Sequence, residues 1–313
     1  MRVNAFIRTA LVVAISGTLV ACGGGGGGSG SDSPATTPLK LDPGNYAGSP
    51  VAVRQSADFD AASRAYTAAL GMQSWLEDVA YLIGEYNAGW NYGEVTPEHC
   101  LEENGNLVIR TRFSDTREFV EYRFENCLVA GYGEPLRLSG RYVYDGTFNP
   151  AAASTHFEIT ETIDIRGSLG VEQQPLAIVG TTFAEGTVRD SRNYSFVLSS
   201  PALEYLIGDD YLALQEVRIG TSEKGDQYSL DMQSKLISST MGGYLNLSTP
   251  VVIEEREGEP CPDKGHMVVS GDGTVEARYG ESSGRGHGLE ILLNGSEVEY
   301  RDTCYVDFGK IGV

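Results

Sequence analysis

Serine, histidine and carboxylate side chains are the groups in this chain that could perform hydrolysis, and their spacing gives it little support. The run Gly280-Glu281-Ser282-Ser283-Gly284 matches the Gly-x-Ser-x-Gly spacing at Ser282, but no helical pattern follows it, as a nucleophile elbow requires. His287 follows in a glycine-rich stretch that is typical of a hairpin connection. The sequence contains no dinucleotide fingerprint, phosphate-binding loop or His-Glu-x-x-His motif. We therefore predict no catalytic residue and no cofactor.

Paired carboxylates are the other route to hydrolysis, because glycosidases use one as an acid and one as a base or nucleophile. The candidate pairs are Glu158 with Glu161 and Asp209 with Asp210. Alternation of apolar residues around the first pair places Glu158 on a polar face and Glu161 on the apolar one. With 43 acidic residues in the chain, chance pairs are expected. Catalysis at either pair is thus disfavoured.

Cysteine chemistry favours disulfides over metal binding. Apart from Cys22, the chain has Cys100, Cys127, Cys261 and Cys304, an even number that suits an exported protein. We predict the pairs Cys100–Cys127 and Cys261–Cys304, because each pair brackets one local run of predicted strands. Zinc is disfavoured because no two cysteines lie close together and the histidines are scattered, so we predict no metal site.

The N-terminus carries an export signal. Arg2 and Arg8 precede an apolar run, residues 10–20, that is too short to span a bilayer, and Leu19-Val20-Ala21-Cys22 follows. This arrangement predicts a signal peptide over residues 1–21 and resembles the type II signals of bacterial lipoproteins. The resemblance implies acylation of Cys22 and, with Gly23 rather than aspartate behind it, transfer to the outer membrane. Two or more acyl chains suffice for stable anchoring.

Residues 22–50 predict a flexible tether. Gly23 to Gly28 is followed by a Ser-, Thr- and Pro-rich stretch that cannot bury a core. As a random coil, this segment spans roughly 30 Å. The folded part is therefore expected to stand off the membrane surface.

Net charge restricts the partners. The chain carries −20, and removing a signal that holds Arg2 and Arg8 makes the mature charge −22. Nucleic acids and anionic headgroups both repel such a protein. We expect no nucleic-acid binding, and membrane contact through the lipid anchor alone.

Residues 96–313 read almost entirely as strands. Apolar and polar residues alternate, as in Phe157-Glu158-Ile159-Thr160, and turn signals such as Asp145-Gly146, Gly225-Asp226, Gly271-Asp272-Gly273 and Asn294-Gly295 separate the runs. This pattern predicts a mainly β fold, a large antiparallel meander preceded by a short helical segment. A curved sheet, an open barrel and a two-sheet sandwich all fit it.

Residues 51–95 form the helical segment. Apolar residues recur there at steps of three and four, which predicts one buried face packed against a sheet: Phe59, Ala62, Tyr66, Ala69, Met72, Leu76, Val79, Ile83 and Tyr86. Aromatic residues gather where helix and sheet would meet: Trp75, Tyr81, Tyr86, Trp90 and Tyr92. These rings are candidates for binding a ligand, and ordinary core packing explains them as well.

Together these features predict an outer-membrane lipoprotein on the periplasmic face that acts as a non-catalytic binding or envelope-assembly module. Its expected partner is an apolar ligand or an envelope protein. The alternatives are a surface-displayed interaction protein and a polysaccharide hydrolase. Periodicity shows which residues point inward, but it does not decide among these functions.

Overall fold

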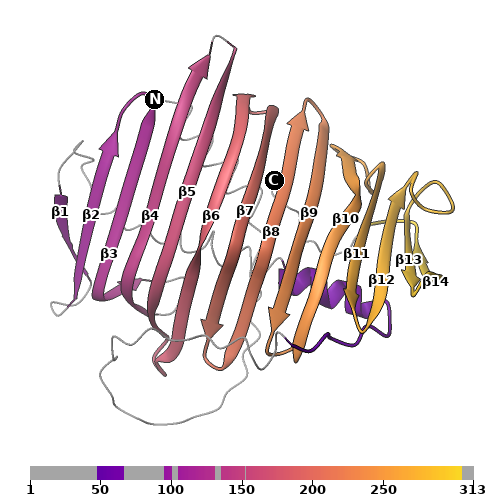
Figure 1. Ribbon diagram of the computed structural model, residues 1–313, viewed down its shortest axis with the longest axis horizontal. Coiled ribbons are helices and arrows are strands. Elements are labelled where there is room, and N and C mark those ends of the chain that lie inside the picture. Colours follow the sequence, from indigo (N-terminus) through magenta and orange to yellow (C-terminus); the bar gives the residue numbers. More distant parts are fainter. Residues whose placement is uncertain (1–47, 67–94, 101–104, 131–134, 152, 305–313) are drawn as a thin grey trace.

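The computed structural model describes residues 48–66, 95–100, 105–130, 135–151 and 153–304. Within these residues, fourteen strands form a single antiparallel sheet whose spatial order follows the sequence from β1 to β14 (Figure 1). The strands are β1 Val95–His99, β2 Asn106–Phe113, β3 Arg117–Ala130, β4 Pro135–Ala151, β5 Ser154–Leu169, β6 Gln174–Asp190, β7 Asn193–Ile207, β8 Asp210–Lys224, β9 Gln227–Ser238, β10 Gly243–Arg256, β11 Lys264–Gly271, β12 Gly273–Gly280, β13 Leu289–Leu293 and β14 Ser296–Arg301. The predicted antiparallel meander is confirmed, and among its forms the chain adopts one open sheet rather than a sandwich.

Tight turns produce the meander. Gly225-Asp226 joins β8 to β9, and Asn294-Gly295 joins β13 to β14 with positive φ at both positions, 48° and 81°, as the hairpin turns that match strand twist require. The predicted turn at Asp145-Gly146 is wrong, because both residues lie inside β4. Gly146 instead makes room for rings, since a Cβ there would stand 3.1 Å from the rings of Tyr144 and Phe148.

Strand alternation divides the sheet into two faces. The inner face is mainly apolar, and β5 shows the pattern: Phe157, Ile159, Ile163 and Ile165 are at most 4% exposed, whereas Glu158, Thr162 and Asp164 on the opposite face are exposed. Buried residues of the same kind continue the inner face from β2 to β13. The outer face is mostly polar and carries one small apolar cluster of Tyr211, Ala213 and Ile237, so the main core lies on one side of the sheet.

A helix over residues 57–66 packs on the inner face near the C-terminal strands (Figure 1). It buries Phe59, Ala62 and Tyr66, the first members of the predicted apolar stripe, and the later members lie outside the described residues. Asp60 pairs with Arg301 in β14. In the described part of the chain, no helix is long and apolar enough to cross a membrane.

Residues 49–53, called the strap here, cross the ends of the C-terminal strands. The Val51 amide donates to the Tyr244 carbonyl at 2.9 Å, and the Asp272 amide donates to the Val51 carbonyl at 2.7 Å. Glycine permits this approach, because a Cβ on Gly271 would lie 2.2 Å from the Val51 oxygen. The strap thus ties the N-terminal side of the helix to β10 and to the β11–β12 turn.

Both predicted disulfides are present. Cys100–Cys127 joins the end of β1 to β3, with Cα atoms 5.2 Å apart, and Cys261–Cys304 joins the segment before β11 to the residues after β14, at 4.8 Å. The bonds close loops of 27 and 43 residues. They therefore fasten the two ends of the sheet, where strands are shortest.

Candidate functional site

Several predicted site residues lie outside the described residues. They are the acylation site Cys22 and the aromatic group of Trp75, Tyr81, Tyr86, Trp90 and Tyr92. Both assignments stay predictions. The candidate sites described below come from the sheet itself.

The inner face holds a buried carboxylate at Glu161, which is 2% exposed. Tyr142 donates its hydroxyl to Oε1 at 2.9 Å, and Thr182 donates to Oε2 at 3.1 Å. Strand register brings these three side chains together, because Glu161 in β5 lies directly opposite Thr182 in β6 and next to the β4 strand that carries Tyr142. A carboxylate among apolar side chains needs such donors, since a polar group buried without hydrogen bonds is costly. Glu161 is therefore a fixed acceptor within an apolar surface.

Glu161 begins a polar row across the inner face, followed by Thr182, Ser200, Ser234 and Thr249, all at most 6% exposed. At the level of this row the ladder is irregular: the pairs β6–β7, β8–β9, β9–β10 and β10–β11 each shift register. Thr249 shows the consequence, because its hydroxyl accepts the Met232 amide at 2.7 Å in place of a strand carbonyl. Bulges bend strands and increase twist. The polar row thus coincides with a line along which the sheet is bent.

The outer face carries an arginine cluster around Glu121. Arg110, Arg123 and Arg141, from β2, β3 and β4, all form ion pairs with this carboxylate, which is 3% exposed while the arginines are 43–51% exposed. Burial raises the pKa of Glu121, but the hydrogen bonds and charges of Arg123 and Arg141 outweigh it and hold the pKa below its usual value. One carboxylate facing three guanidinium groups leaves a positive surface on an acidic protein.

A second outer-face group, the His–Glu cluster, consists of His156, Glu158 and Glu185. The His156 Nε2 lies 3.7 Å from Glu158 Oε1 and 3.9 Å from Glu185 Oε1, and the three ligand atoms all lie within 4.8 Å of one another. Glu158 in β5 and Glu185 in β6 are direct cross-strand partners. We did not predict this cluster from sequence. The only sequence signal is the His-x-Glu spacing, which puts His156 and Glu158 on one face of a strand.

The structure separates the first candidate carboxylate pair. Glu158 and Glu161 point to opposite faces, as alternation predicted, with side-chain exposure of 67% for Glu158 against 2% for the whole residue Glu161. These two carboxylates therefore do not face a shared space, as a glycosidase site requires. In the second pair, Asp209 lies in the β7–β8 turn and Asp210 begins β8, where the Thr240 hydroxyl donates to Asp210 at 3.2 Å.

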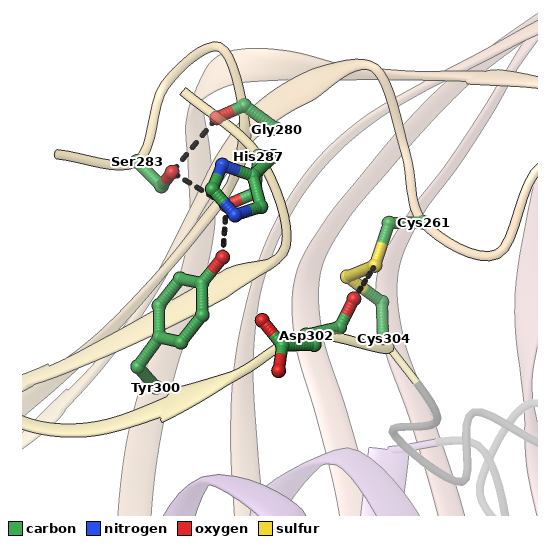
Figure 2. The surroundings of a disulfide bond; sticks show 7 residues. All are labelled: Cys261, Gly280, Ser283, His287, Tyr300, Asp302 and Cys304. Carbon is green, nitrogen blue, oxygen red and sulfur yellow. Dashed lines mark hydrogen bonds between the residues drawn. A yellow bond between two sulfur atoms is a disulfide. The ribbon is translucent and has the colours of Figure 1, made fainter. Parts of the chain in front are cut away.

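The loop that carries Ser283 and His287 is held together by side-chain hydroxyls that donate to its backbone carbonyls, as Figure 2 shows. Ser283 Oγ contacts the carbonyls of Gly280 and His287 at 2.9 and 2.8 Å, and Tyr300 donates its hydroxyl to the same His287 carbonyl at 3.1 Å. The His287 Nδ1 faces the Arg285 carbonyl at 2.9 Å rather than Ser283. This loop is therefore a closed hairpin connection beside the Cys261–Cys304 disulfide, as its glycines predicted.

Comparison of the chain with protein-family models, with curated proteins and with solved structures finds no match. The described residues instead present three distinct settings for a carboxylate. Glu161 sits among hydroxyls on the apolar face, Glu121 sits under arginines, and Glu158 and Glu185 share one histidine.

Proposed function

We propose that the protein is a lipoprotein of the bacterial outer membrane, acylated at Cys22, and that its sheet is a non-catalytic binding module at the periplasmic face. The observation that carries this proposal is the inner face. It is one continuous apolar surface from β2 to β13 on a single open sheet, interrupted by the polar row that starts at Glu161.

An apolar ligand suits this surface. A sheet with one apolar face must pack that face against a second layer, and a ligand with hydrocarbon chains can contribute to such a layer. Glu161 and the hydroxyls of the polar row would meet the polar part of the same ligand and fix its orientation. Binding such a ligand requires no catalytic group. The proposed flexible tether would let the sheet reach partners some distance from the anchor.

Native mass spectrometry tests the binding proposal. The mature chain carrying Cys22→Ser would be expressed in a bacterial periplasm, purified without detergent, and measured before and after denaturation. We expect additional mass that disappears on denaturation and has the composition of a lipid. A clean monomer mass would contradict ligand binding and favour the surface-displayed interaction protein.

Acylation is tested separately, by growing cells with an alkyne analogue of palmitate and detecting label on the full-length protein. Wild type should be labelled and recovered with the outer membrane, whereas Cys22→Ser should be unlabelled and soluble in the periplasm. Equal labelling of both proteins would rule out Cys22 as the anchor. The four disulfide cysteines are present in both, so they serve as an internal control.

A further inference from the structure

Arginine side chains form ion pairs with several of the acidic residues that lie on strands of the outer face. Asp145 pairs with Arg117 at 2.8 Å, Asp231 with Arg218 at 2.6 Å, and Glu276 with Arg278 at 2.9 Å. Among the described residues, Glu158 and Glu185 have no ion pair with an arginine or a lysine, and His156 is their shared neighbour.

Their position makes this lack of a cation costly. Glu158 and Glu185 lie directly opposite each other in the β5–β6 ladder, and like charges in that position destabilise a sheet. The residues in register around them are neutral, since Thr147 and Asn149 come from β4 and Thr187 from β6. The two carboxylates therefore need a positive charge that the surrounding strands do not supply.

The backbone beneath the cluster is regular. β5 and β6 pair from Thr155 to Leu169 without a register shift, so His156, Glu158 and Glu185 start from fixed Cα positions on one face. A tetrahedral ion with bonds of about 2.0–2.2 Å holds its ligand atoms roughly 3.4 Å apart. The His156 Nε2 distances of 3.7 and 3.9 Å come close to that spacing, and exposed side chains can close the difference by small rotations.

We propose that His156 Nε2 and one carboxylate oxygen from each of Glu158 and Glu185 bind a divalent transition-metal ion of the zinc class. Two carboxylates neutralise the charge of the ion, and the imidazole nitrogen favours a transition metal over Ca²⁺ or Mg²⁺, which prefer all-oxygen sites. With three protein ligands the fourth position is open to water or to a donor group of a partner. The site lies on the face opposite Glu161, so it is independent of the proposed ligand surface.

Isothermal titration calorimetry with ZnCl₂ tests the site on the full mature chain carrying Cys22→Ser, after removal of metal with EDTA. We expect one saturable site, much weaker heats with CaCl₂ or MgCl₂, and a loss of affinity of at least about tenfold in His156→Gln and in Glu185→Gln, since even changes around the ligands cost about that much.

His266→Gln is the matched control. His266 Nε2 also faces a carboxylate on the outer face, Glu276 at 3.1 Å, but there Arg278 supplies the positive charge, and no second carboxylate among the described residues completes a site. This variant should bind Zn²⁺ as wild type does. The proposal is overturned if wild type shows no saturable binding, or if His156→Gln binds as tightly as wild type.

Nuclear magnetic resonance of the unsubstituted histidines keeps the test decisive if a variant folds poorly. The ring signals of His156 should shift on addition of one equivalent of Zn²⁺ while those of His266 and His287 stay in place. Shifts confined to the other histidines would overturn the proposal.

Discussion

The arginine cluster and the His–Glu cluster lie on the same outer face, but their carboxylates differ in burial and in the number of cations around them. Glu121 meets three guanidinium groups and is almost fully buried, with 3% of its side chain exposed. Glu158 and Glu185 share one imidazole and stay 67% and 73% exposed. In these two clusters, the carboxylate that several cations surround is removed from water, and the carboxylates without such cations stay in water, because desolvating an uncompensated charge is expensive.

Removing the charge at the centre of the arginine cluster should have the largest effect. We expect Glu121→Gln to lower the free energy of unfolding by about 2 kcal/mol, less than the roughly 3–5 kcal/mol of a fully buried pair because the arginines are half exposed. Urea unfolding of the two proteins measures the difference. Arg117→Gln, which breaks the exposed pair with Asp145, is the control and should unfold at the same urea concentration as wild type. Equal stability of Glu121→Gln and wild type would mean that the cluster contributes nothing.

Acid should erase the same contribution. The pKa of Glu121 is lower in the folded protein than its usual value, so the folded state binds its proton less readily than the unfolded state does. Its stabilisation is therefore fully present above the usual glutamate pKa, about 4.3, and is lost as the pH falls through the lowered pKa. Urea midpoints of wild type and Glu121→Gln should converge as the pH is lowered from neutrality to well below the usual glutamate pKa. A difference that stays constant over this range would contradict an ionised Glu121.

Adding a lysine to the His–Glu cluster should make it resemble the arginine cluster, in which cations compensate the carboxylate. In EDTA, Glu185→Lys should raise the stability by about 0.5–1 kcal/mol, because it replaces a like-charge cross-strand pair with an opposite one. The same substitution removes a proposed metal ligand. In thermal melts, Zn²⁺ should therefore raise the melting temperature of wild type but not of this variant. If Glu185→Lys proved less stable than wild type, the opposed carboxylates would not be a source of strain.

Thinning the arginine cluster should have the smallest effect. Arg110→Gln leaves two guanidinium groups on Glu121, so we expect a loss of only a few tenths of a kcal/mol, reduced further in high salt. Urea unfolding in low and high salt checks this result. A loss as large as that of Glu121→Gln would show that the three arginines act as a unit rather than redundantly.

Much of the fold could be predicted because a strand buries every second residue. The alternation around Phe157 and Ile159 identified the inner face, and the bracketing of strand runs by cysteines identified both disulfides. Alternation does not state whether a sheet closes, doubles or stays open, so the single open sheet came from the structure. The turn predicted at Asp145-Gly146 was wrong because sequence alone does not distinguish a glycine that makes room for aromatic rings inside a strand from a glycine in a turn.

The His–Glu cluster depended on strand register, which spacing alone does not determine. A turn over residues 170–173, with positive φ at Gly170 and Gln173, pairs Leu169 with Gln174 and so sets Glu185 opposite Glu158. A shift of one residue in that turn would move Glu185 to the inner face. Only His156 and Glu158 were recognisable as neighbours from the sequence.

The strap determines where mechanical load would enter the molecule. A pull on the chain from the N-terminal side of Gly48 reaches the sheet through the hydrogen bonds of the strap, first from the Tyr244 amide to the Ser49 carbonyl and then between Val51 and both Tyr244 and Asp272. In a lipid-anchored protein, tension would therefore act first on β10 and the β11–β12 turn and leave the long strands β4 to β7 unloaded. The proposed anchor and the proposed metal site would then be mechanically separate.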